Sequence, residues 1–426
     1  MRAPQILPLL FLLLTSALQA QVTAIRAGTL IDPAAGTAAR DQIILVEGKT
    51  VKAVGPKLAI PRGATVIDLS GSAVLPGLFD AHTHLCMTVN MRRDAGSYYY
   101  TTLNDPDSYR AIQGVANARS MLETGFTTVR DIGNEGEFAC TSLRRAVAGG
   151  LVDGPTIINA GRIIAPYGGQ FQLQPDKGEV LATPEYFFAD TRDELLKAVR
   201  ENIHYGATVI KLVVDDQRYI YTPEDIRFVV DEAAKSGIKV AAHAWTEAGA
   251  HNAALAGVAS MEHLNGISDE DLALAKRNGV VAVFTPFPAA VLKGFRGEER
   301  GQEEYEQEID RLRAGHKAGV TIAFGTDAIH DLPGTTRGSL AITWIDSYLD
   351  AGMPSPAILQ AMTINAARLL GVEKERGTIA PGMAADIIAA PGDPLADVRT
   401  LKQVHFVMKD GKVVKSQTSR PRTANR

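Results

Sequence analysis

The sequence predicts an α/β fold: a (β/α)8 TIM barrel with a small β-sandwich domain formed from both chain ends. Three observations predict it. A unit of helix, glycine and short apolar run recurs through the middle of the chain. The two ends carry short strands separated by turns instead. The length of 426 residues exceeds one ordinary core and favours a large domain beside a smaller one.

The recurring unit places buried strands after helices that end in glycine, which adopts the left-handed conformation without a steric penalty. The apolar runs do not alternate with polar residues, as is typical of parallel strands buried on both faces. Eight such strands favour a closed barrel over an open doubly wound sheet, the alternative fold. The predicted strands are 73–80, 125–131, 156–160, 206–211, 237–243, 257–263, 279–285 and 319–327.

Amphipathic segments between these runs predict the helices of the barrel. Thr222 precedes Pro223, and Ser268 precedes Asp269, so both hydroxyl residues suit helix N-caps. The clearest predicted helices are 193–205, 223–236, 269–278 and 305–318.

The chain ends predict the second domain. Short strands are expected at 23–30, 42–46, 50–54 and 65–69, and again at 386–389 and 404–409. Glu47-Gly48-Lys49 and Asp410-Gly411-Lys412 are hairpin-type turns in similar settings. The predicted organisation is therefore a signal peptide (1–20), a composite β-sandwich domain (21–75 plus 377–426) and a barrel (76–376).

The first residues indicate export. Arg2 precedes an apolar run at 6–14, and a small residue, Ala20, follows at the expected cleavage site. The run is too short to cross a bilayer, and a buried helix is the alternative. We therefore expect a periplasmic or secreted protein without a membrane anchor after cleavage. Cys86 and Cys140 can pair in an oxidising compartment, although the sequence does not establish that they do.

The charge balance excludes one class of partner. The net charge is −4, with 44 basic and 48 acidic residues, so no basic stripe for nucleic acid is expected.

Polar residues with metal-binding chemistry stand at matched strand ends, which is where the active site of a (β/α)8 barrel lies. Taken singly, the histidine pair of the first strand suits a polar strand end equally well, each later histidine is more often structural, and the aspartate can cap a helix. As a set they match the nitrogen and oxygen ligands that zinc or a similar ion prefers. The set is His82, His84, Lys211, His243, His263 and Asp327.

Lys211 favours a metal site over structural roles for these polar residues. It stands within an apolar run, where a protonated amine is costly and cannot ligate a cation. A neutral amine can react with carbon dioxide to form a carbamate, whose two oxygens can bridge two metal ions. The alternative is a lysine that extends to pair with Asp215 or Asp216.

These motifs resemble the amidohydrolase superfamily. Leu75-Pro-Gly-Leu-Phe-Asp-Ala-His-Thr-His84 looks like its first-strand signature, and the later candidate ligands follow in order. Segments 363–371 and 382–388 resemble its closing helix and returning strand. Within the superfamily the chain is most similar to the imidazolonepropionase-related, Xaa-Pro dipeptidase-like hydrolases.

The resemblance implies a binuclear centre, most simply of zinc. His82, His84 and Asp327 would hold the first ion, and His243 and His263 the second. N6-carboxylated Lys211 and a hydroxide would bridge them. The hydroxide would attack an amide carbonyl, with Asp327 acting as base and then acid.

The expected activity is that of a dipeptidase, a carboxypeptidase-like enzyme or an N-acyl amino acid hydrolase. One alternative is a mononuclear cyclic-amide hydrolase or deaminase, which does not require Lys211. The other is a non-enzymatic binding barrel, which the complete ligand set disfavours. A small-molecule or dipeptide-like amide and a homo-oligomeric state are expected.

Loops after the strands set specificity in such barrels. Arginine and tyrosine donors there can bind a substrate carboxylate. The residues that we expect to bind substrate are Arg218, Tyr219, Tyr221 and His330, with further candidates in the loop after the first strand (Arg92, Arg93 and residues 98–100). Relatives often have Gly-Gly-His where this chain has Gly168-Gly-Gln170, so the donor at that position is altered.

Overall fold

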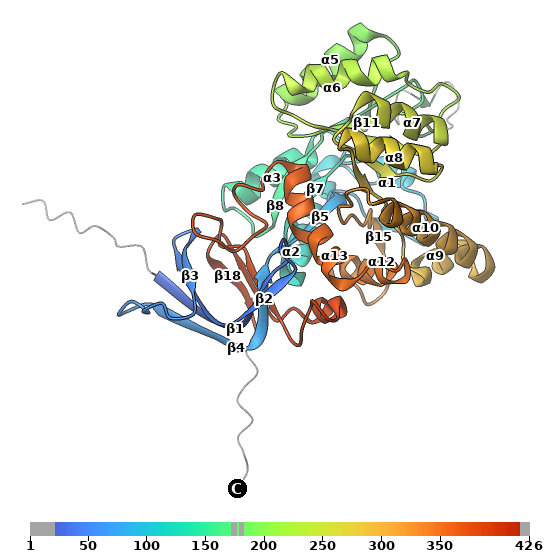
Figure 1. The fold of residues 1–426 in the computed structure, drawn as a ribbon. Coiled ribbons are helices and arrows are strands. Elements are labelled where there is room, and N and C mark those ends of the chain that lie inside the picture. Colours follow the sequence, from blue (N-terminus) through green and yellow to red (C-terminus); the bar gives the residue numbers. More distant parts are fainter. Residues whose placement is uncertain (1–21, 172–176, 179–182, 418–426) are drawn as a thin grey trace, which may run out of the picture.

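The computed structural model describes residues 22–171, 177–178 and 183–417, and contains a barrel beside a small β domain (Figure 1). The predicted signal peptide, residues 1–20, lies outside the described residues. Among the helices of the described part, none is both long and apolar enough to cross a membrane.

Strands from both ends of the chain share one seven-stranded sheet, in the order β18-β17-β16-β4-β1-β2-β3. β16 pairs antiparallel with β4, which joins the two chain ends as predicted. The sheet also folds back on itself, because Val51 N on β3 donates to Met383 O, just before β16, at 2.8 Å. The strands are β1 (Val22–Asp32), β2 (Thr37–Glu47), β3 (Thr50–Gly55), β4 (Thr65–Pro76), β16 (Ile387–Ala390), β17 (Phe406–Lys409) and β18 (Lys412–Ser416).

The β domain has its own apolar core because alternate side chains of these strands point to the inside of the folded sheet. Ile25, Ile44, Val74 and Phe406 are among its buried members. The predicted turns at Gly48 and Gly411 join β2 to β3 and β17 to β18, and both glycines adopt positive φ.

The barrel strands pair in parallel and in chain order. They are β5 (Leu78–Thr83), β7 (Phe126–Asp131), β8 (Thr156–Asn159), β11 (Ile210–Val213), β12 (Val240–Ala244), β13 (Ser260–His263) and β14 (Val281–Val283). β9 (Ile163–Ala165) follows β8 in the chain and pairs with β11, and β10 (Tyr186–Phe188) pairs with β9.

Residues 320–327 take the eighth position, although they form no regular strand in the structure. Ile322 forms a bridge with Ala282 on one side, and Ala81 N donates to Phe324 O at 2.8 Å on the other. These bonds connect β14 back to β5, and they close the barrel as the sequence predicts.

The predicted first strand, 73–80, is wrong in its bounds. The chain leaves the β domain with β4 at Pro76 and begins the barrel with β5 at Leu78. Gly77 lies between them, and a Cβ there would come within 2.1 Å of Thr127 Oγ1. The apolar residues continue through both strands, so the change of sheet leaves no mark in the hydrophobic pattern.

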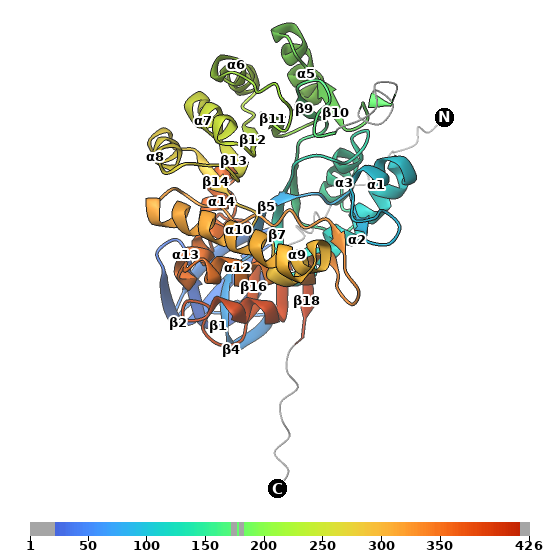
Figure 2. The same ribbon diagram turned by 90° about the vertical axis from the view of Figure 1, so that its right-hand side faces the viewer.

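Helices surround the barrel, and α5 to α8 lie side by side outside β11 to β14 (Figure 2). Thr222 and Ser268 cap α6 and α8 as predicted, and each hydroxyl accepts a backbone N–H three residues on. The helices are α1 (Tyr99–Asn104), α2 (Asp107–Thr124), α3 (Ala139–Ala148), α5 (Arg192–His204), α6 (Pro223–Ala234), α7 (Glu247–Ala256), α8 (Asp269–Asn278), α9 (Ala289–Arg296), α10 (Glu298–Ala318), α11 (Arg337–Ala341), α12 (Ile345–Asp350), α13 (Ser355–Gln360) and α14 (Ala366–Leu370).

Candidate metal centre

A cavity of about 540 Å³ opens at the carboxyl ends of the barrel strands. Histidines from β5, β12 and β13 line it together with a lysine from β11 and an aspartate that follows the eighth strand position. The structure therefore brings all the predicted ligand residues to one place: His82, His84, Lys211, His243, His263 and Asp327.

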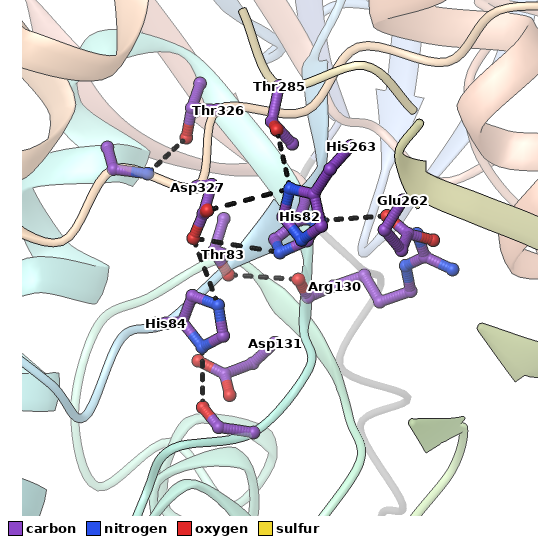
Figure 3. Close-up of polar contacts among 12 residues, drawn as sticks. His82, Thr83, His84, Arg130, Asp131, Glu262, His263, Thr285, Thr326 and Asp327 are labelled. Carbon is purple, nitrogen blue, oxygen red and sulfur yellow. Dashed lines mark hydrogen bonds and ion pairs between the residues drawn. The ribbon is translucent and has the colours of Figure 1, made fainter. Parts of the chain in front are cut away.

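The first group of ligands surrounds the Asp327 carboxylate (Figure 3). Oδ1 of Asp327 lies 3.2 Å from His84 Nε2 and 3.7 Å from His82 Nε2. The other ring nitrogens are held from behind, His82 Nδ1 by Glu262 Oε2 at 2.8 Å and His84 Nδ1 by Gly133 O at 2.7 Å. Such outer partners fix a metal-binding imidazole and leave its second nitrogen for the ion.

The second group contains His243 and His263, whose ring centroids are 4.7 Å apart. His263 Nδ1 contacts Thr285 Oγ1 at 2.9 Å. His243 Nε2 is buried and lies 2.9 Å from Asp216 Oδ2, and it has no hydrogen-bond partner among the described residues. A buried nitrogen without a hydrogen-bond partner is what a ligand position for a cation offers.

Lys211 lines the same cavity as the two groups and is only 2% exposed. It forms no hydrogen bond and no ion pair within 4.0 Å among the described residues. The alternative partner Asp215 is used elsewhere, because it accepts from the backbone N–H of Trp245 and Thr246. The geometry therefore gives no support to a lysine paired with Asp215 or Asp216.

Burial lowers the proton affinity of three of the predicted nitrogen ligands, Lys211, His82 and His263. It lowers the pKa of Lys211 to about 8, against the opposing effect of Glu262 and Asp327. Burial, with the Lys211 charge, lowers the pKa of His82 to about 4, and it holds the pKa of His263 well below its usual value. Because a metal binds only the deprotonated imidazole, these histidines are ready to ligate at neutral pH.

Asp327 behaves in the opposite way. Burial alone would raise the pKa of this carboxyl, but the adjacent His82 and His84, with Lys211, bring it to about 2. The cavity thus combines imidazoles, an amine with a lowered pKa and one carboxylate. This donor set fits divalent ions of the zinc type.

Two ligands stand on unusual backbone. His263 has φ of +69° and Asp327 has φ of +53°, a left-handed conformation that is rare outside glycine. Strand alternation directs Glu262 to the barrel interior, and the turn at His263 lets its side chain face the same cavity. The neighbours Glu262 and His263 can both point into the barrel only because the backbone turns at His263.

A buried polar network below the ligands was missed from the sequence. Arg130 on β7 donates to Glu262 Oε1 at 2.7 Å, to Ser260 Oγ at 2.8 Å and to Ala81 O at 2.5 Å. Glu262 in turn holds His82, so the network orients a predicted ligand. The available signal was a charged residue, Arg130 or Glu262, inside each of two predicted buried strands.

Some of the predicted substrate-binding residues line the cavity and others do not. His330 lines the cavity, with its ring 3.8 Å from that of Phe295, and so does Gln170, whose amide donates to Asp216 at 2.8 Å. His330 also belongs to β15 (His330–Asp331), which pairs with β6 (Val89–Asn90) after the first strand.

Arg218, Tyr219 and Tyr221 are not among the residues that line this cavity, which corrects the prediction. Tyr221 is buried, and its hydroxyl donates to Ala189 O at 2.5 Å, while Arg218 and Tyr219 are exposed. Tyr221 N donates to Val214 O, so this loop folds back over its own strand. A loop's path depends on such bonds and not on its composition.

The loop after the first strand contributes two tyrosines. Tyr98 and Tyr99 line the cavity, whereas Arg93 is held by Asp94 and by two bonds to Asp105, each at 2.7 Å. Both cysteines, Cys86 and Cys140, are buried free thiols.

Several known proteins match this chain over most of its length. A model of the Amidohydrolase family matches residues 73–414. An ochratoxinase of Aspergillus niger is 29% identical over 446 residues, covering 95% of this chain and 89% of that protein. An imidazolonepropionase of Sphingopyxis alaskensis is 26% identical over 395 residues, covering 86% and 90%. The crystal structure of a Xaa-Pro dipeptidase with bound methionine in the active site superposes with a TM-score of 0.83 at 28% identity, covering 93% of this chain and 100% of that one.

Proposed function

The chain belongs to the amidohydrolase family and is a metal-dependent hydrolase of carbon–nitrogen bonds, and from this premise we propose a binuclear amidase. Its substrates would be dipeptides or N-acyl amino acids. The observation that carries the proposal is Lys211, a buried amine with no partner among the described residues, surrounded by the histidines of the cavity. A single-ion deaminase or cyclic-amide hydrolase leaves this lysine without a role.

In this proposal the ligand residues divide between two ions. His82, His84 and Asp327 would hold one ion, because their ligand atoms all lie within 4.8 Å of one another. His243 and His263 would hold the second, and N6-carboxylated Lys211 would contribute an oxygen to each. Zinc suits these nitrogen and oxygen donors. Divalent ions bound there lower the pKa of water and polarise a substrate carbonyl.

Asp327 is the residue placed to move the proton. Its side chain is 19% exposed, whereas those of His82 and His84 are 1% and 6% exposed, so its carboxylate faces the space where substrate would bind. With a pKa of about 2 it is ionised at neutral pH. It can accept a proton from the attacking water and pass it to the departing nitrogen, as base and then acid.

Relatives support the amide class. The names of an ochratoxinase and a Xaa-Pro dipeptidase describe two different substrates processed by proteins similar to this chain. A dipeptide or an N-acyl amino acid fits a cavity of about 540 Å³.

The test is turnover of a defined panel by the zinc-reconstituted protein. The panel contains Xaa-Pro and other dipeptides, N-acetyl amino acids, a cyclic amide and an aminopyrimidine, and the release of free amine is measured. We expect hydrolysis of the first two classes, and a loss on the order of 10³-fold in kcat for Asp327→Asn. Turnover of the cyclic amide or aminopyrimidine alone would contradict the proposal.

We also propose that the mature protein is exported, because Arg2 and the apolar run at 6–14 have the order of a signal peptide. N-terminal sequencing of the protein from the compartment outside the inner membrane checks this. A start near Gln21 is expected, and an intact Met1 in the cytoplasm would contradict it.

A further inference from the structure

One cation in the cavity wall lacks an anion. Arg311, on α10, lines the same cavity as the ligand residues. Its Nε atom is buried without a hydrogen-bond partner, and the guanidinium has no ion pair within 4.0 Å among the described residues. Burial lowers the pKa of Arg311 from its usual value, as expected of a charge removed from water.

The nearby acids are occupied. Glu308 Oε2 accepts the backbone N–H of Phe287 at 2.6 Å, and Glu304 pairs with Arg296 at 3.0 Å. Both acids act on Arg311 only through space. Arg311 is therefore left with unused donors that face a cavity.

Other buried arginines of the barrel, unlike Arg311, have partners for their guanidinium groups. Arg110 pairs with Glu185, and Arg130 pairs with Glu262. Arg337 donates to the carbonyls of His84 and Met87, each at 2.8 Å. Each of these buried guanidinium groups is satisfied within the protein, as the cost of burying an unpaired charge requires.

Arg311 also lies close enough to the ligand residues for one substrate to reach both. Arg311 and the predicted ligand residues line the same cavity. A planar guanidinium binds a carboxylate with two parallel hydrogen bonds, which fixes both the position and the orientation of that group. The amide nitrogen of an N-acyl amino acid is one carbon atom away from its carboxylate.

Part of the wall of the cavity that Arg311 lines is apolar, although Glu304, Glu308 and Arg296 also line it. The apolar part consists of Phe287, in the segment between β14 and α9, and of Leu292 and Phe295 on α9. His330 packs on Phe295, and burial lowers its pKa to about 4, so this side of the cavity carries a neutral imidazole at pH 7. Such a surface accepts an aliphatic or aromatic side chain.

We propose that Arg311 binds the terminal carboxylate of the substrate and that the apolar wall holds the side chain of the same residue. The leaving group would then be an apolar amino acid with a free carboxylate. This inference rests on the proposed amidase function and narrows its substrate class.

The test measures binding with probes that contain no amide bond. 4-Methylpentanoate, which is leucine without its amino group, is compared with the neutral 4-methylpentan-1-ol on the zinc-loaded protein. Trp245 lines the cavity, so tryptophan fluorescence reports binding. A charge-assisted bidentate pair predicts that the carboxylate binds about 30-fold more tightly.

Substitution then locates the contact. Arg311→Gln is expected to reduce the carboxylate preference to within about threefold, and Arg311→Lys to retain part of it. Arg313→Gln is the matched control, since Arg313 is on the same helix but pairs at the surface with Asp310, and it should keep the full preference. Equal binding of both probes by the wild type, or an unchanged preference in Arg311→Gln, would overturn the inference.

Failure of the inference can be told from failure of the proposed function. Hydrolysis of N-acetyl-L-leucine without a carboxylate preference in the probe experiment would overturn only the role of Arg311. A carboxylate preference lost in Arg311→Gln, together with no amide turnover by the wild type, would support the binding site and contradict the amidase.

Discussion

Single residues of the cavity have proton affinities that burial and close neighbours set together. Lys211 and His82 lose affinity for protons, whereas Glu308, on α10 beside Arg311, gains it. Burial, opposed by Arg311, raises the pKa of Glu308 to about 8. Glu308 is not a predicted metal ligand, so its titration can be followed separately from metal binding.

Glu308→Gln should change the pH dependence of stability. The folded state keeps the Glu308 proton up to about pH 8, while the unfolded chain releases it near pH 4.5. The stability from this proton is complete below about pH 4.5 and is lost as the pH rises towards 8. The variant should therefore exceed the wild type in stability at pH 8, by an amount on the order of a few kcal/mol, and match it near pH 4.5.

Urea unfolding of the metal-free proteins at pH 5 and pH 8 measures this difference. Glu306→Gln is the control, because Glu306 is exposed on the same helix. It should follow the wild type at both pH values. Equal stability of Glu308→Gln and the wild type at pH 8 would show that the burial of Glu308 has no such cost.

The sequence predicts which candidate metal ligands line the cavity better than it predicts which loop residues do. His243 and His263 stand at strand ends, and the repeat of glycine and apolar run marks those ends in the chain. Arg311 has no such mark. It is one of several charged residues on α10, and only its position against the cavity distinguishes it from Arg313.

At the scale of elements, strand and helix interiors follow their sequence patterns, but junctions do not. α8 has the predicted bounds, because Ser268 caps its start and Gly279 ends it in the left-handed conformation. The boundary at Gly77 was missed, since two apolar strands in different sheets meet there. The bounds of α8 depend on its own capping residues, whereas the boundary at Gly77 depends on packing against Thr127.

Contact between α11 and α2 supports the first ligand loop. A Cβ on Gly338 would lie 2.1 Å from Ser120 O, so Gly338→Ala must displace α11. Arg337, the preceding residue, holds the carbonyls of His84 and Met87. We expect a loss of about 2 kcal/mol or more in unfolding free energy and weaker metal binding.

Chemical unfolding and a zinc titration of Gly338→Ala check this. Gly294→Ala is the matched control, because Gly294 is inside α9 and a Cβ added there would meet no atom within 4 Å. It should equal the wild type or gain up to about 1 kcal/mol from helix propensity. If Gly338→Ala were as stable as Gly294→Ala, the close contact between α11 and α2 would be contradicted.

At the scale of the whole molecule, bound metal should join distant parts of the chain. The ligand residues come from β5, β11, β12, β13 and the segment after the eighth strand position. The closed barrel and the composite β domain were both predicted, because periodic repeats and matched chain ends are global features of the sequence. The irregular eighth strand position was not, since its backbone depends on its neighbours.

Removing the metal should therefore lower the thermal stability of the whole barrel. Each site at 1,000-fold ligand excess over Kd adds about 4 kcal/mol, because the ion binds the folded state alone. We expect a chelator to lower Tm and zinc to restore it, as measured by calorimetry. A Tm that is the same with and without chelator would indicate that no ion links these strands.

The most direct test of the binuclear centre is the metal content of the purified protein, wild type beside Lys211→Ala, by plasma emission. His251→Ala is the control, since His251 pairs with Asp271 away from the cavity. The wild type and the control should contain two equivalents of zinc or a similar ion, and Lys211→Ala one or none. One equivalent in the wild type, unchanged in Lys211→Ala, would contradict a lysine-bridged pair of ions.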